Sequence, residues 1–84
     1  MNESEPSVLV DLKHGIAPFD GPYSEVVERR DSLLNRCKRM GIEREATEAL
    51  RILKLSEIRP DEFEYIIAKR RMPRRLEMRL RNGS

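Results

Sequence analysis

The side chains that could take part in catalysis or metal binding are few and scattered. The sequence contains a single histidine, His14, and a single cysteine, Cys37. A protein metal site needs several ligands, and neither residue has another histidine or cysteine nearby. Cys37 falls on the apolar stripe of an expected helix, where a buried structural thiol is the usual outcome. We therefore predict no metal site, no cofactor and no nucleophilic catalysis.

The carboxylates do not suggest acid–base chemistry either. They lie on the polar face of one expected helix and at the start of another: Glu43, Glu45 and Glu48, then Asp61, Glu62 and Glu64. Raising the pKa of a carboxyl group requires burial or a close like charge, and the pattern indicates neither. In a chain of 84 residues, this predicts a protein that is not an enzyme and has no small-molecule substrate.

The clearest chemical feature is an arginine-rich block near the C-terminus. Residues 69–81 contain one acid, Glu77, and seven basic residues: Lys69, Arg70, Arg71, Arg74, Arg75, Arg79 and Arg81. The block has a formal charge of +6, whereas the rest of the chain, with ten basic and fourteen acidic residues, has −4. The planar guanidinium group suits phosphate and carboxylate. The sequence therefore predicts that these seven residues contact an anionic partner.

Three interpretations of the basic block remain open. It can bind the backbone of a nucleic acid, where cations release counterions without reading sequence. It can dock on an acidic protein surface, or it can be a solvated tail with no specific partner. The block has no interleaved aromatic residues, which argues against stacking on single-stranded bases. We take nucleic-acid binding by a small regulatory protein as the first hypothesis.

The elements expected to carry these residues are helices. Apolar residues recur at helical spacing over 23–40 and 43–54. A third helix is expected to begin at Pro60, followed by Asp61 and Glu62, and a short fourth one spans about 73–81. The fold class predicted from this pattern is all-α, a small domain of three to four helices.

The N-terminal residues are expected to form an extended arm. Residues 7–13 suggest a short extended segment, and residues 14–22, with two glycines and two prolines, suggest a loop. This divides the chain into an arm and loop over 1–22 and a helical domain over 23–84, with the basic segment at 69–82. Because a lone strand leaves its backbone unpaired, the arm must cover the helices or pair with another chain.

The alternative function is a protein–protein interaction module, such as an adaptor, an inhibitor or a small subunit. Its predicted contact residues are apolar and come from the arm and the fourth helix: Val8, Val10, Leu12, Met72, Leu76 and Leu80. The last three are also spaced for core packing. A thin core without tryptophan predicts a homodimer or a subunit of a complex.

The sequence also bears on the compartment. No apolar stretch approaches the roughly 20 residues of a membrane span, and the acidic, polar N-terminus does not resemble a secretion signal. A single cysteine suits a reducing environment. We therefore expect a cytoplasmic protein that does not bind membranes.

Overall fold

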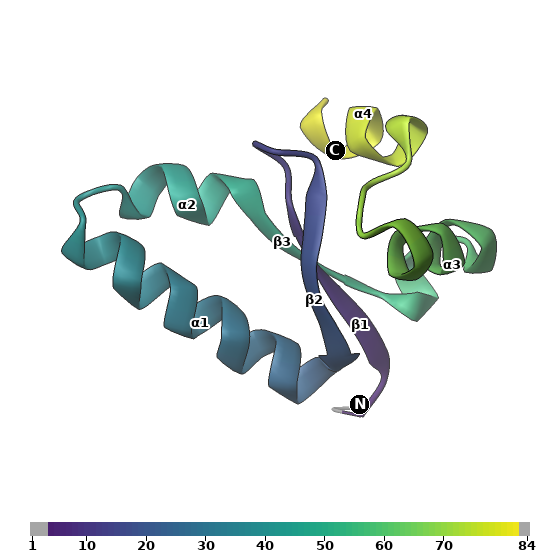
Figure 1. The fold of residues 1–84 in the computed structure, drawn as a ribbon, viewed down its shortest axis with the longest axis horizontal. Coiled ribbons are helices and arrows are strands. Elements are labelled where there is room, and N and C mark those ends of the chain that lie inside the picture. The colour runs from purple at the N-terminus through teal and green to yellow at the C-terminus, as the bar shows by residue number, and fades with distance from the viewer. Residues whose placement is uncertain (1–3, 83–84) are drawn as a thin grey trace.

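The computed structural model describes residues 4–82, and within them it contains both strands and helices (Figure 1). In chain order the elements are β1 (Pro6–Asp11), β2 (Ile16–Pro22), α1 (Tyr23–Arg39), α2 (Glu43–Ala49), β3 (Leu50–Lys54), the one-turn 3-10 helix η1 (Leu55–Glu57), α3 (Pro60–Lys69) and α4 (Arg74–Arg81). The fold is therefore α+β, and the all-α prediction is wrong. The helices near 23–40, from Pro60 and near 73–81 are confirmed.

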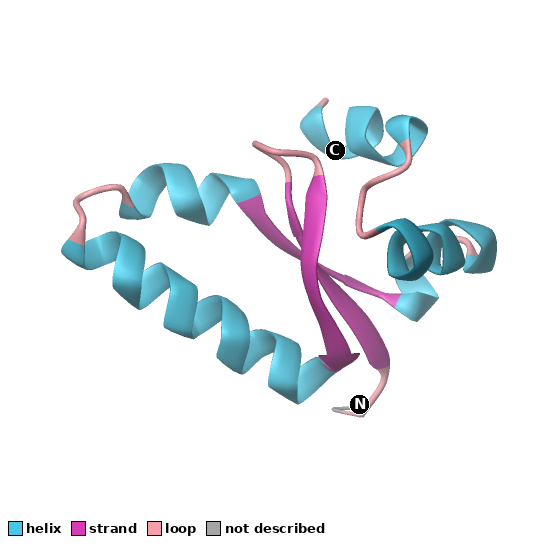
Figure 2. Cartoon of the chain, in the orientation of Figure 1, coloured by secondary structure: helices cyan, strands magenta, loops and turns pink. Residues whose placement is uncertain are grey.

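The strands form one antiparallel sheet in the order β2-β1-β3, with the N-terminal strand in the centre (Figure 2). Leu9 of β1 lies opposite Phe19 of β2 on one side and opposite Ile52 of β3 on the other. Residues 6–11 are therefore not a free arm, because both edges of β1 are paired within the chain. The backbone groups that would have needed a partner are satisfied by β2 and β3.

The sequence of β1 suits this central position. Successive side chains of a strand point to opposite faces, so Val8 and Val10 face one side of the sheet and Leu9 the other. All three are fully buried. A continuous apolar run is therefore explained by a strand that is covered on both faces, whereas a strand with one wet face would alternate.

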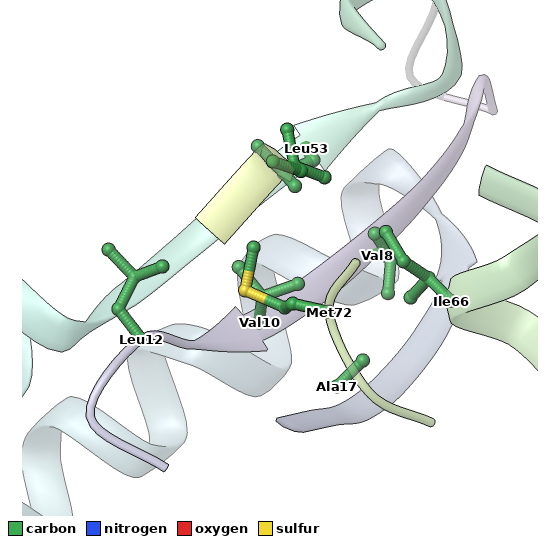
Figure 3. Close-up of a cluster of buried hydrophobic side chains, with 8 residues drawn as sticks. Val8, Val10, Leu12, Ala17, Leu53, Ile66 and Met72 are labelled. Carbon is green, nitrogen blue, oxygen red and sulfur yellow. The ribbon is translucent and has the colours of Figure 1, made fainter. Parts of the chain in front are cut away.

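One face of the sheet packs against α3 and α4 and forms the main core (Figure 3). The buried members of this cluster are Val8, Val10, Leu12, Ala17, Leu53, Ile66, Met72 and Leu76. Leu80 is partly buried against it. Met72, Leu76 and Leu80 thus serve as core packing, which is one of the two roles that their spacing predicts.

The other face of the sheet is covered by α1. Val26 is the one fully buried residue of this helix, and α2 has none. Two cation–aromatic contacts link α1 to the sheet. Arg29 Cζ lies 4.5 Å from the centre of the Phe19 ring, and Lys54 Nζ lies 4.6 Å from the centre of the Tyr23 ring. Beyond this region α1 and α2 project from the sheet as a helical hairpin, on the side away from α3 and α4 (Figure 1).

The second predicted helix, 43–54, is wrong in its second half. Helix α2 ends at Ala49, and Leu50–Lys54 becomes the edge strand β3. A short, mostly apolar segment such as residues 50–53, which contains Arg51, fits a helix or a strand equally well by periodicity. The pairing of β3 with β1 decides between them, and this long-range contact is invisible in the local pattern.

The predicted loop 14–22 is also wrong over most of its length. Only the turn between β1 and β2 is irregular, and Gly15 takes a positive φ of 67° there. Residues 16–22 form β2, which contains Pro18 and Pro22. Proline has no N–H to donate to a ladder, so it is excluded from central strands but tolerated in an edge strand, where one side of the backbone is unpaired. The prolines are therefore compatible with the edge strand β2.

Candidate nucleic-acid interface

The link between α3 and α4 is tied to the edge of the sheet. Arg70 ends α3 in the left-handed conformation, with φ 56° and ψ 30°. Its carbonyl oxygen accepts a hydrogen bond from the Ala17 amide at 3.0 Å, and the Met72 amide donates to the Gly15 carbonyl at 3.1 Å. These bonds turn the chain sharply and fix the basic block beside the β1–β2 turn.

Three of the seven predicted basic residues are engaged within the chain. Arg70 pairs with Asp20 of β2. Arg79 pairs with Glu62 of α3, with 3.2 Å between Nη2 and Oε1. Arg81 pairs with Glu77 at 2.9 Å and also donates to the Leu12 carbonyl. These three arginines hold α3, α4 and the sheet together, so their role is at least partly structural.

Glu62 is central to this arrangement. Its side chain is only 10% exposed, and its Oε1 atom also accepts a hydrogen bond from the Arg59 amide at 3.1 Å. The carboxylate therefore satisfies an N-terminal amide of α3 while it neutralises Arg79 of α4. The sequence pattern identifies Glu62 only as a residue of the first helical turn.

The other four basic residues are exposed and unpaired. Within residues 4–82, no hydrogen bond or ion pair is made by the side chains of Lys69, Arg71, Arg74 and Arg75. We call these four the open cations. They lie at the end of α3, in the link and in the first turn of α4. The basic block therefore divides into residues that build the fold and residues that remain available to a ligand.

The β1–β2 turn adds Lys13 and His14, which the sequence pattern did not assign to this surface. Asp11 organises the turn, because its carboxylate accepts hydrogen bonds from the Lys13 amide at 2.9 Å and the His14 amide at 3.4 Å. The same carboxylate lies 2.8 Å from Nδ1 of His14. The Lys13 side chain is left exposed. It is therefore a fifth cation for the surface.

The turn and the basic block enclose a shallow hollow of about 360 Å³. Its charged and polar lining comes from Lys13, His14, Tyr65, Arg71, Arg74, Glu77 and Arg81. Glu77 is already paired with Arg81, so the unbalanced charge comes from Lys13, Arg71 and Arg74. The volume is many times the roughly 30 Å³ that a water molecule occupies. The hollow is large enough for a phosphate group and has the matching charge.

The predicted protein-interaction residues lie elsewhere. Val8, Val10 and Leu12 are 0 to 7% exposed, and Met72 and Leu76 are equally buried. Leu80 is only partly buried, at the edge of the core. Five of the six side chains are therefore inaccessible to a partner in this fold. Strand β1 also cannot be added to a partner's sheet, because both of its edges are paired with β2 and β3.

Over residues 4–82, no group of three or more His, Cys, Asp or Glu side chains is placed to hold a metal ion. None of the helices in this range has both the length and the apolar composition needed to cross a membrane. The chain matches no protein-family model, no curated protein and no solved structure.

Proposed function

We propose that this chain is a small non-enzymatic regulatory protein that binds the phosphate backbone of nucleic acid. The observation that carries the proposal is that five cations, the open cations and Lys13, lie around one junction of the fold with no ion-pair partner among residues 4–82. Three of them line a single hollow. The neighbouring acids Asp20, Glu62 and Glu77 are each paired with an arginine already. Asp11, which bonds the Lys13 and His14 amides, offsets one positive charge at most, so the surface keeps a net positive charge.

The chemistry of the surface favours phosphate over a base edge. Arginine forms bidentate hydrogen bonds with phosphate oxygens, and three of the five cations are arginines. The hollow contains one aromatic side chain, Tyr65, which is fewer than a stacking platform for single strands requires. The contacts proposed here position the protein on a duplex and carry no sequence information.

An acidic protein surface is the second candidate ligand, because carboxylates also suit arginine. It would use the same open cations, not the buried residues of β1. The proposal also places the protein in the cytoplasm, where the free thiol of Cys37 would stay reduced.

A pair of charge-matched variants tests the proposal. The first is Arg71→Gln/Arg74→Gln/Arg75→Gln, which removes three open cations. The control is Arg29→Gln/Arg44→Gln/Arg59→Gln, which removes three exposed cations elsewhere. Both variants have the same net charge, so a general loss of positive charge affects them equally. Thermal melts by circular dichroism establish that both are folded.

Binding of each protein to mixed-sequence duplex DNA is then titrated at about 150 mM salt, a physiological ionic strength. We expect the wild type and the control to bind and the open-cation variant to lose binding. Equal binding by the two variants would contradict the assignment of the surface. If the wild type itself does not bind duplex DNA or RNA, the nucleic-acid proposal fails and an acidic protein becomes the partner to seek.

A further inference from the structure

The α1–α2 hairpin carries an apolar stripe that the chain itself covers incompletely. Val27, Leu33, Leu34 and Cys37 are spaced along one side of α1, and all are only half-buried. The sheet covers the beginning of α1, around Val26, and beyond that point α2 runs alongside α1 while the hairpin projects away from the sheet (Figure 1). A helix with an apolar stripe is ordinarily buried along it. Part of the apolar stripe is therefore exposed to solvent in a single chain.

The end of the hairpin is more apolar than a solvent-exposed turn needs to be. Met40 is 67% exposed, and Ile42, two residues further along, is 42% exposed. These side chains extend the half-buried stripe of α1 into the turn before α2. Apolar groups that adjoin in this way mark an interaction surface more strongly than scattered ones.

The charges on the hairpin indicate what covers the stripe. The last turn of α1 has three exposed cations and no acid: Arg36, Lys38 and Arg39. Helix α2 is acidic, with Glu43, Glu45 and Glu48 against Arg44. Within residues 4–82, Arg44 and Glu48 pair with each other at 3.9 Å, but the three α1 cations, Glu43 and Glu45 form no ion pair. Two oppositely charged segments therefore lie on one hairpin without neutralising each other.

We infer that the α1–α2 hairpin docks on the hairpin of a second copy of this chain. In a two-fold symmetric interface the same patch contacts itself in reverse. With the two hairpins side by side and their tips at the same end, each α1 lies antiparallel to the α2 of the partner. The basic end of α1 then meets the acidic start of that α2, twice, and the two apolar stripes are covered in a four-helix arrangement. A partner of one charge sign would complement only half of this surface, whereas a second copy complements all of it.

The edges of the sheet are less suitable for self-association, because β2 contains Pro18 and Pro22 and is tied to the α3–α4 link at Ala17. The outer edge of β3 is open, but this strand carries Arg51 and Lys54. Charged residues on an edge strand, especially lysine, oppose edge-to-edge pairing. The central strand β1 is unavailable because both its edges are paired. The hairpin also lies on the side of the sheet away from α3 and α4, so the dimer would leave both basic surfaces exposed.

Charge reversal provides the test, and it does not depend on nucleic-acid binding. The variant Lys38→Glu/Arg39→Glu makes both segments acidic, and Glu43→Lys/Glu45→Lys makes both basic. The third variant combines all four changes. It makes the end of α1 acidic and the start of α2 basic, so the two segments again carry opposite charges. Sedimentation velocity over a concentration series, in reducing agent, measures the dimer against the 9.9 kDa mass of one chain.

We expect the wild type to dimerise, each reversal to weaken the dimer by about tenfold or more because like charges oppose each other, and the combined variant to recover it. Circular dichroism spectra show whether all variants keep the fold. A wild type that stays monomeric at the highest concentration overturns the inference. A dimer that is insensitive to both reversals uses another surface and overturns it equally.

Discussion

The two helical pairs on opposite faces of the sheet are built differently. Helices α3 and α4 contribute Ile66 and Leu76 to the core and are tied together through the buried carboxylate of Glu62. Helix α1, although it has 17 residues, has one fully buried residue, Val26, and α2 has none. The α3–α4 face therefore holds most of the buried core, whereas α1 and α2 contribute one fully buried residue to the other face.

This difference separates the charged residues by role. On the α3–α4 side, Arg70, Arg79 and Arg81 stabilise the fold, which leaves the open cations for a ligand. On the α1–α2 side, five hairpin charges form no ion pair within residues 4–82: Arg36, Lys38, Arg39, Glu43 and Glu45. Ligand binding and self-association are therefore expected at separate places on the molecule.

The largest expected effect comes from truncating the core on the α3–α4 face. Leu76 is 1% exposed, and replacing it with alanine should lower the free energy of unfolding by about 2–5 kcal/mol, because a cavity remains. Replacing half-buried Leu33 with alanine should lower the free energy of unfolding by clearly less. Urea unfolding at low protein concentration measures both. Equal losses would show that the two faces are equally well packed.

Removing the Glu62 carboxylate should have the next largest effect. Glu62→Gln weakens the bond from the Arg59 amide and the pairing with Arg79. We expect a loss of about 1 kcal/mol in unfolding free energy, because a neutral amide accepts a weaker hydrogen bond than a carboxylate and no longer neutralises Arg79, whose side chain is 56% exposed. Glu64→Gln, an exposed site in the same helix, is the control and should change little. If both substitutions behave alike, Glu62 does not link α3 to α4.

A smaller effect is expected for Lys13, which the fold places beside the basic block. Lys13→Gln should leave unfolding unchanged and weaken duplex binding. The slope of log affinity against log salt should become shallower by about one unit, as for the loss of one phosphate contact. Arg44→Gln, at the far end of the molecule on α2, should leave the slope unchanged. If Lys13→Gln also left the salt slope unchanged, the β1–β2 turn would not be part of the binding surface.

The smallest effect concerns Glu5 and pH. The hydroxyl and amide of Ser56 donate hydrogen bonds to the Glu5 carboxylate and lower its pKa. A lowered pKa means that this contribution to stability is fully present above the ordinary carboxyl pKa and is lost as the pH falls through the folded value. The stability difference between the wild type and Glu5→Gln should therefore shrink on acidification. A constant difference would mean that Glu5 does not act as an ionised acceptor.

The sequence predicted the helices better than the sheet, for a physical reason. The signals for α1, α3 and α4 are local, since apolar spacing and Pro60 lie within each helix. The strands depend on long-range pairing between residues 6–11 and 50–54. Neither the end of α2 at Ala49 nor the strand character of Leu50–Lys54 can be decided from nearby residues alone.

The sequence predicts the composition of the basic block but not its geometry. All seven basic residues were identified from the charge pattern, yet nothing in that pattern distinguishes Arg79, paired with Glu62, from Arg74, which is unpaired. Lys13 was not assigned because it reaches the block only through the β1–β2 hairpin. The apolar run in β1 did carry a usable signal, since three consecutive buried positions suggest a central strand.

The most direct test of the central claim is the salt dependence of duplex binding by the wild type and by Arg71→Gln/Arg74→Gln/Arg75→Gln. Each phosphate contact contributes about 0.9 to the slope of log affinity against log salt on duplex DNA. If the open cations contact phosphates, the slope of the variant should be shallower by nearly three units. A variant with the same slope as the wild type would show that these residues do not contact the backbone and would contradict the account.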